Sequence, residues 1–216
     1  MNKTVLLAGV ASALFAVNAN AIEFTPYVSG KITYSDISYD GTDSWTHGSN
    51  PGSAKTDLDD KVWGASIAAG TAVKVSGGSI RAELEYNWND TAEKSMYVKD
   101  LRANGTAELE SQSLFLNAYY DIDTGTKFTP YVGGGIGYAK IEGSMSMPGM
   151  NISEDDTNFA WQLGAGVAYA VNKNISVDFG YRYTDMGDLT ANIYPTEKFK
   201  IDVDSHELLL GVRYTF

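Results

Sequence analysis

Ser205 to Phe216 reads Ser-His-Glu-Leu-Leu-Leu-Gly-Val-Arg-Tyr-Thr-Phe. At the two-residue period of a β-strand, one face carries mainly apolar and aromatic side chains from Leu208 to Phe216, and the other carries Glu207 and Arg213. In a soluble sheet the apolar face would point into a core. In a membrane barrel it would meet lipid, and the charged face would line the lumen. The orientation of this strand therefore decides the fold.

The composition limits the chemistry open to the chain. Its 216 residues suit a single domain, with no Cys, two His and a formal net charge of -11. The absence of Cys excludes a disulfide framework and thiol chemistry, and two His leave little for a zinc site or a histidine-based triad. Phosphate binding requires clustered Lys and Arg, which an acidic chain does not favour. We therefore expect no cofactor and no nucleic-acid partner.

Residues 1–21 have the parts of a secretory signal peptide. Lys3 is the positive region, Val5 to Val17 is the apolar run, and Ala19-Asn20-Ala21 is an A-x-A cleavage site. The apolar run is shorter than the roughly 20 residues that a membrane helix needs. We predict that residues 1–21 are a signal peptide and that residues 22–216 form one barrel domain. Charge or Gly interrupts every later apolar run, so insertion into a membrane would require a closed barrel.

Eight segments show the alternation of a strand with one apolar and one polar face. In the clearest of them, Ile80, Leu84 and Trp88 alternate with Arg81 and Glu85. The pattern predicts strands at about 24–37, 59–73, 80–88, 108–122, 128–140, 158–170, 175–185 and 205–216. Phe115 is the exception, because it places an aromatic ring on an otherwise polar face.

The connections between these strands alternate in length. Long loops are predicted at about 39–57, 89–107, 142–157 and 186–203, and short turns at 74–78, 123–125 and 171–174. Long loops outside and tight turns in the periplasm are typical of outer-membrane barrels. The sequence therefore predicts an all-β fold: a closed eight-stranded antiparallel up-and-down transmembrane β-barrel with four long extracellular loops and three short periplasmic turns.

Charged residues in the middle of the strands fall on the inward face of this barrel. Lys or Arg on the lipid face at the bilayer midplane would cost about 2–4 kcal/mol, and buried charges are tolerated only when paired. We therefore predict a lumenal ion-pair network made of Lys31, Arg81, Glu83, Glu85, Asp178, Arg182, Glu207 and Arg213. Inward glycines are expected to leave room for its long side chains, at Gly133, Gly135, Gly137, Gly164 and Gly166.

Several motifs together resemble a known family. The segment Phe128-Thr-Pro-Tyr-Val-Gly-Gly-Gly-Ile-Gly-Tyr-Ala-Lys140, which repeats a theme begun at Phe24, the A-x-A signal and the terminal Val-Arg-Tyr-Thr-Phe216 are similar to small outer-membrane barrels of the opacity-protein and OmpA-like transmembrane type, the porin-family surface antigens. This resemblance implies residence in the outer membrane of a Gram-negative bacterium. It also implies contact with lipid and lipopolysaccharide, and insertion by the barrel-assembly machinery, with Tyr214 and Phe216 as the assembly signal.

The preferred functional hypothesis is a non-enzymatic surface barrel with a side-chain-filled lumen. Its acidic loops would serve envelope integrity or adhesion and contact a partner outside the cell. Glu154, Asp155 and Asp156 are candidate ligands for a divalent cation, because carboxylate oxygens suit Ca²⁺ and Mg²⁺. The pattern is more typical of a solvated acidic loop, since it lacks the spacing of an EF-hand.

Three alternatives remain open from the sequence. A narrow channel for small solutes would use the Gly-lined side of the lumen. A lipid-modifying barrel enzyme would use His206, although Ser205 and Glu207 fall on the opposite face of the strand from it. A soluble lipocalin-like carrier would require the reverse orientation, with an apolar lumen and a wet exterior.

Overall fold

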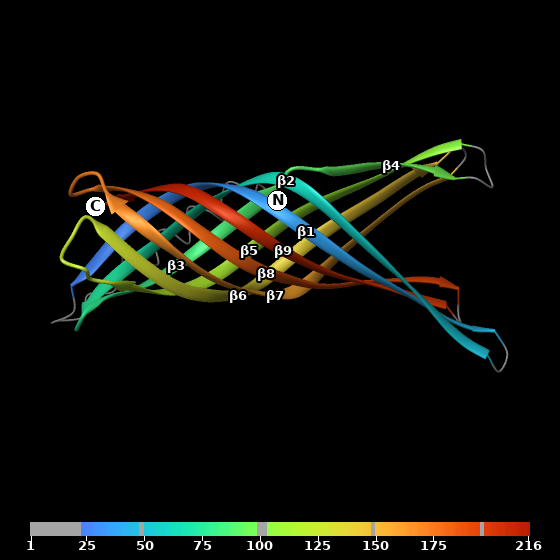
Figure 1. Cartoon of the computed structure of the whole chain (residues 1–216), viewed down its shortest axis with the longest axis horizontal. Coiled ribbons are helices and arrows are strands. Elements are labelled where there is room, and N and C mark those ends of the chain that lie inside the picture. Colours follow the sequence, from blue (N-terminus) through green and yellow to red (C-terminus); the bar gives the residue numbers. More distant parts are fainter. Residues whose placement is uncertain (1–22, 48–49, 99–102, 148–149, 195–196) are drawn as a thin grey trace, which may run out of the picture.

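The structure, a computed structural model, describes residues 23–47, 50–98, 103–147, 150–194 and 197–216. The predicted signal peptide lies outside these residues. The described chain is almost entirely β-structure (Figure 1), and none of its elements is a helix long and apolar enough to cross a membrane. Its strands are β1 (Phe24–His47), β2 (Asn50–Val75), β3 (Gly78–Asn89), β4 (Ala92–Val98), β5 (Ala103–Ile122), β6 (Phe128–Met147), β7 (Met150–Ala170), β8 (Ile175–Tyr194) and β9 (Glu197–Thr215).

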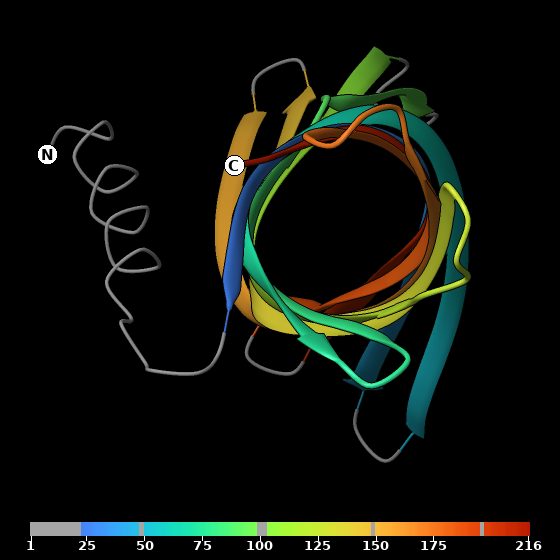
Figure 2. The ribbon, with the colours of Figure 1, turned by 90° about the vertical axis from the view of Figure 1, so that its left-hand side faces the viewer.

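These strands close into one antiparallel ring, seen in Figure 2 from the end that carries the short turns. The ring runs in the order β3-β2-β1-β9-β8-β7-β6-β5, and pairing of β3 with β5 closes it. β4 also pairs with β5, beyond the end of β3. β3 and β4 are therefore successive segments of one barrel strand, which is interrupted at Asp90 and Thr91. When β3 and β4 are counted as one, the described residues form a ring of eight strands, and the predicted eight-stranded barrel is confirmed.

The prediction of four long loops is wrong for the backbone, because most of the residues concerned belong to strands. The strands continue through most of them as regular hairpins, which pair as far as His47 with Asn50, Val98 with Ala103, Met147 with Met150, and Tyr194 with Glu197. The Gly, Ser and Asp residues there indicated turns. An antiparallel ladder satisfies backbone N–H and C=O groups whatever the side chain, so pairing outweighs these weak local preferences.

The three short turns lie where the sequence predicted them, although the first is tighter than expected. Lys74 and Val75 still belong to β2, which leaves only Ser76 and Gly77 to connect it to β3. Gly77 has a φ of 81° and Gly125, in the second turn, a φ of 67°. Glycine adopts this left-handed backbone conformation without steric cost, which explains its use in both turns.

Apolar side chains face outward and polar side chains face the lumen, as a membrane barrel requires. The neighbours Phe115 and Leu116 on β5 are 1% and 59% exposed, so the strand alternates between a lumenal and an outer side. On β3 and β9, Arg81 and Arg213 are buried inside, while Leu210 is 49% exposed outside. A lipocalin-like carrier would require the reverse arrangement, and that alternative is therefore wrong.

Aromatic side chains form a girdle near each end of the apolar exterior. Tyr34 packs on Trp63 with ring centroids 5.1 Å apart, and Trp161 packs on Tyr183 at 5.5 Å, at the end nearer the hairpins. At the other end, Phe128 packs on Tyr169 at 5.1 Å and Tyr214 on Phe216 at 5.2 Å. Aromatic girdles of this kind mark the two interfaces between membrane and water.

Beyond the hairpin-side girdle the ring divides into two sheets, which splay apart at the right of Figure 1. Pairing of β7 with β8 stops at Trp161 and Asp185, where β8 has a register irregularity next to Gly187, whose φ is 78°. Pairing of β2 with β3 stops at Gly64 and Asn89. We call the sheet β2-β1-β9-β8 the first wing and the sheet β4-β5-β6-β7 the second wing.

Placing a charge on the outer surface between the girdles tests this orientation. Leu116→Arg is expected to lower the free energy of unfolding in lipid vesicles by about 2–4 kcal/mol, because the guanidinium would face acyl chains. The matched change Gln112→Arg, on the same side of β5 but near the rim, is expected to cost about 0–1 kcal/mol. Urea titration monitored by Trp fluorescence measures both values, and equal costs would contradict the assignment.

Candidate functional site

The lumen is organised by the inward row of β3. Alternation brings Arg81, Glu83, Glu85 and Asn87 to the inner side of the ring, where all four are buried. Carboxylates held this close inside a narrow tube need cationic partners from other strands. Lys31 of β1 and Arg182 of β8 supply those cations from across the ring.

The half of the network nearer the hairpins is built around Lys31, Glu85 and Arg182. The Lys31 ammonium lies 3.0 Å from Glu83 and 2.9 Å from Glu85. Arg182 Nη1 lies 3.2 Å from the other oxygen of Glu85, and its Nε donates to Glu207 at 2.6 Å. Each of these carboxylates therefore contacts at least one cation.

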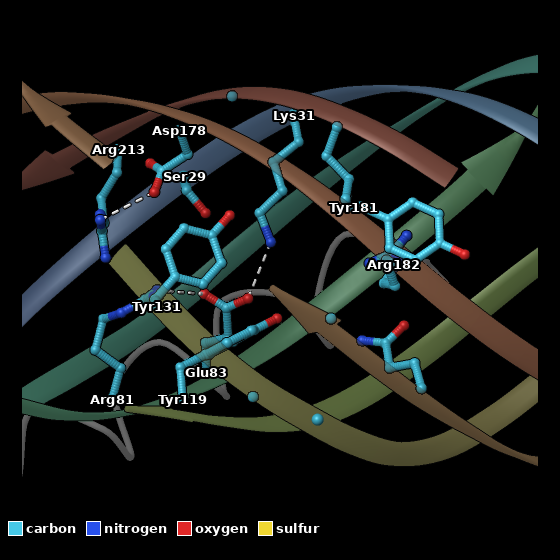
Figure 3. Close-up of a pocket in the computed structure, with 16 residues that line it drawn as sticks. Ser29, Lys31, Arg81, Glu83, Tyr119, Tyr131, Asp178, Tyr181, Arg182 and Arg213 are labelled. Atoms are coloured by element: carbon cyan, nitrogen blue, oxygen red, sulfur yellow. Dashed lines mark hydrogen bonds and ion pairs between the residues drawn. The ribbon is translucent and has the colours of Figure 1, made fainter. Parts of the chain in front are cut away.

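The half nearer the short turns is built around Arg81 and Arg213 (Figure 3). Arg81 Nε donates to Asp121 at 2.8 Å, and Arg213 Nη2 donates to Asp178 at 3.0 Å. A longer contact, Arg213 to Asp121 at 3.9 Å, joins the two pairs of this half, and another, Arg81 to Glu83 at 3.8 Å, links this half to the other. The structure thus brings all eight predicted residues into one connected network.

Asp121 is the member that sequence reasoning missed. It lies on the inward side of β5, buried to 7% exposure, in line with Asn117 and Tyr119. The two-residue alternation of the strand places Asp121 on the inward face and could have revealed this residue. However, Asp121 lies beside the predicted turn at 123–125, where a charged residue is usual at the end of a strand. With Asp121 included, five carboxylates face the four cations Lys31, Arg81, Arg182 and Arg213.

Neutral side chains complete the hydrogen bonding. Asn117 Nδ2 donates to Glu85 at 2.8 Å, and Gln162 Nε2 donates to Asn117 Oδ1 at 2.6 Å. Ser66 Oγ donates to Glu85 at 2.7 Å and Tyr27 OH donates to Glu83 at 2.8 Å. Extra donors of this kind are what a buried carboxylate requires beyond its ion pair.

The inward glycines serve tyrosine and asparagine more than Arg or Lys. A Cβ on Gly133 would lie 2.3 Å from the Tyr119 ring, and one on Gly166 would lie 2.5 Å from the Tyr131 hydroxyl. The two rings in turn flank Arg81, whose guanidinium carbon lies 4.5 Å from the Tyr119 centroid and 5.1 Å from that of Tyr131. The expectation that Gly133 and Gly166 make room for long cationic side chains is therefore corrected.

An apolar layer crosses the lumen just beyond the hairpin-side girdle. Its residues are buried and come from β1, β2, β5, β6, β7, β8 and β9. We call this layer the apolar plug, and it consists of Ile37, Val62, Phe115, Ala139, Ile141, Ala160, Met186 and Val203. Phe115, which broke the polar pattern in the sequence, is part of it, and this explains why an aromatic ring faces inward there.

The described lumen contains a smaller and a larger cavity. One, of about 30 Å³, lies among the ion pairs and is lined by Ser29, Lys31, Gln162 and Asp178, among others. The other, of about 210 Å³, lies at the end with the short turns and is lined by hydroxyl residues such as Thr25 and Thr129, with Arg81 and Arg213. Open space thus adjoins the periplasmic end, whereas the apolar plug occupies the other end.

The remaining candidate residues lie outside the lumen. His206 is exposed on the lipid side, where Nδ1 contacts the Tyr181 hydroxyl, while Ser205 and Glu207 are buried inside. The structure therefore does not bring these three together as a triad. Tyr214 and Phe216 lie at the periplasmic rim, and the Phe216 N–H donates to Pro26 O at 3.1 Å. Their role as an assembly signal stays a prediction.

The predicted acidic cluster lies in β7, above the girdle. Asp155 is exposed and lies 3.3 Å from the Lys140 ammonium, Asp156 is half-buried, and the side chain of Glu154 lies outside the described part. Hydrogen bonds from Lys140 to Glu142 and then to Asp155 raise the pKa of this lysine above its usual range. Within the described residues, no three His, Cys, Asp or Glu side chains gather closely enough to hold a metal ion.

A closed antiparallel barrel with an apolar exterior, two aromatic girdles and paired charges inside is an outer-membrane β-barrel protein. The chain belongs to the family described as "Outer membrane protein beta-barrel domain", which it matches over residues 4–216. The protein is therefore located in the outer membrane of a Gram-negative bacterium.

Named relatives agree with this family. Outer membrane protein PagN of Salmonella typhimurium is 34% identical over 122 residues, a match that covers 50% of this chain and about half (51%) of PagN. Opacity protein opA57 of Neisseria gonorrhoeae is 26% identical and is matched over 97% of its length and 88% of this chain. The outer membrane protease OmpT of Escherichia coli superposes with a TM-score of 0.55 at 8% identity, over 91% of this chain and 99% of OmpT, and shares the fold alone.

Removing one carboxylate from the network tests its contribution. Glu85→Gln is expected to lower the free energy of unfolding by about 3–5 kcal/mol, because Lys31 and Arg182 would stay buried with one partner fewer. The control Glu142→Gln breaks a solvent-exposed pair with Lys140 and is expected to leave stability unchanged. Urea unfolding in vesicles measures both, and a Glu85→Gln barrel as stable as the parent would show that the network is dispensable.

Proposed function

We propose that this protein is a non-enzymatic surface adhesin of the outer membrane. The barrel anchors it, and the two wings contact a partner outside the cell. The observation that carries the proposal is the contrast between the two parts: ion pairs and the apolar plug fill the lumen, while the strands continue far beyond the girdle. A filled barrel has little room for a solute, whereas the projecting sheets offer a large surface.

The reach of the wings supports this role. From the girdle residue Tyr34 to the end of β1 at His47, the chain is an uninterrupted strand. At about 3.3 Å per residue this segment is roughly 40 Å long, enough to carry its tip beyond the lipid headgroups. Paired strands also hold the surface in a fixed form, which lowers the entropy lost when a partner binds.

Two other roles agree less well with the geometry. A channel would have to pass the apolar plug, where Phe115 and Ile141 are essentially inaccessible to solvent, and a dry apolar constriction opposes the passage of ions. A lipid-modifying enzyme built on His206 would lack the help of Ser205 and Glu207, which face the lumen. Contacts with lipopolysaccharide and with the barrel-assembly machinery remain part of the proposal, supported by the girdles and by the strand that ends at Phe216.

Shortening one hairpin tests the adhesive role. The pair Tyr39 and Leu58 can be removed with everything between them, and an Asn-Gly turn can join Ser38 to Asp59, which face each other across the ladder. A non-adhesive bacterial host expressing this variant is expected to lose most of the cell binding that the full chain confers. Heat-modifiable gel mobility controls for a folded barrel. Undiminished binding would show that the β1–β2 hairpin of the first wing is not the adhesive surface.

Cysteine accessibility tests the closed lumen, since the chain has no native Cys. Thr129→Cys, which lines the periplasmic cavity, is expected to react with a membrane-impermeant maleimide only after the outer membrane of the cells is permeabilised. Thr157→Cys, exposed on the second wing, is expected to react in intact cells. Rapid labelling of Thr129→Cys from outside would indicate an open path and favour the channel.

A further inference from the structure

The division of the rim into two wings leaves one side of β7 open. Toward β6, β7 is paired up to Met150, but toward β8 its ladder ends at Trp161. Just beyond Trp161 the two strands still touch, because Asn158 Nδ2 donates to Asp188 O at 2.7 Å. Among the described residues, the segment 150–157 therefore has a strand neighbour on the β6 side only (Figure 1). An open sheet edge presents unpaired backbone groups, and proteins use such edges to bind extended chains.

The direction of the backbone groups on this edge follows from one hydrogen bond. The Ala170 N–H donates to Lys127 O at 2.9 Å, toward β6. N–H directions alternate along a strand, and the β6–β7 ladder runs without a register shift. The odd-numbered residues of β7, Thr157 included, therefore direct their N–H and C=O groups toward the gap. The Thr157 N–H donates to the carboxylate of its own neighbour Asp156, at 2.7 Å.

The same local arrangement recurs wherever the ring opens. An aspartate carboxylate accepts a backbone N–H from a residue one or two positions later: Asp60 from Lys61 at 2.8 Å, Asp90 from Thr91 at 2.9 Å, and Asp185 from Gly187 at 2.9 Å. A short side chain thus takes the place of a neighbouring strand. At these positions an incoming acceptor would have to replace only a side chain, and not a neighbouring strand.

The charge of the β7 edge specifies the kind of partner. Residues 150–157 include Glu154, Asp155 and Asp156 and no Lys or Arg. At the base of the gap lie Ala160 of β7 and Met186 of β8, both part of the apolar plug. A strand laid along this edge would meet carboxylates and an apolar floor, which favours a segment that alternates basic and apolar side chains.

We propose that the open edge of β7, residues 150–157, binds an extended basic segment of a partner polypeptide by strand addition. A carbonyl of the incoming strand accepts the Thr157 N–H in place of the Asp156 carboxylate, which then pairs with a Lys or Arg of the partner. This inference rests on the proposed function, because the edge must face the outside of the cell. It goes beyond it by naming the edge and the chemistry of the partner.

A labelled peptide that alternates Lys and Val is the probe, with the full barrel in nanodiscs of zwitterionic phosphatidylcholine. Fluorescence anisotropy is expected to detect binding, and Thr157→Pro is expected to weaken it by about tenfold, because proline removes the edge donor. Proline is tolerated on an open strand edge, so the barrel should still form. The control Thr157→Val keeps the N–H and is expected to bind like the parent.

Further comparisons separate strand addition from simple charge attraction. A peptide of equal charge interrupted by proline is expected not to bind, and Asp155→Asn combined with Asp156→Asn is expected to weaken binding of the alternating peptide. Equal binding of both peptides, or no effect of Thr157→Pro, would overturn the proposal. Particles containing two barrels held together through Thr157 would assign the edge to a second copy, which would also overturn it. Cell adhesion without peptide binding would overturn this inference and leave the proposed function standing.

Discussion

Neutralisation of charge inside a narrow closed ring is the constraint on which the rest of the structure depends. Within lipid every backbone polar group needs a partner in the protein, so the strands must close on themselves. Closure turns the polar face of each strand into one small lumen, where Lys31, Arg81, Arg182 and Arg213 can only be accommodated beside carboxylates. Apolar side chains consequently cover the outside, where acyl chains replace water.

Under the proposed function, this arrangement also separates the membrane anchor from the surface that would bind a partner. The lumen is occupied by paired ions and tyrosine rings, and the apolar plug lies across its outer end. The part of the molecule left to meet a partner is the portion beyond the girdle, where the strands no longer contact lipid. Outside the bilayer, water can hydrogen-bond to backbone groups, so the ring does not need to stay closed and it opens at Gly187 and at Asp90. The two wings consequently expose strand edges that could not be accommodated within lipid.

Much of the barrel could be predicted from the sequence because lipid and lumen impose opposite chemistry at a period of two. That period alone placed the eight charged residues of the network on the inner face. Asp121 escaped because a carboxylate next to a turn is usual at a strand end. The hairpins escaped because Gly, Ser and Asp indicate turns, whereas backbone pairing depends on a neighbouring strand far away in the sequence.

The opening between β7 and β8 was likewise beyond sequence reasoning. It depends on a register irregularity between Asp185 and Asp188, which only the partner strand defines. The inward glycines of β6 and β7 show that sequence reasoning is limited in the same way. The pattern indicated free space beside them but not which side chain would fill it. Local periodicity therefore predicts which way a residue faces, and three-dimensional pairing decides what it meets.

Labelling from within the bilayer tests the orientation of the side chains most directly. The protein is reconstituted with a lipid that carries a photoactivatable group in its acyl chain, and crosslinked residues are mapped by mass spectrometry. The account predicts crosslinks to Leu116, Val132 and Leu210, which are exposed on the outside, and none to Phe115 or Tyr27, which are buried in the lumen. Crosslinks to Phe115 and Tyr27, with Leu116 and Leu210 unlabelled, would contradict it.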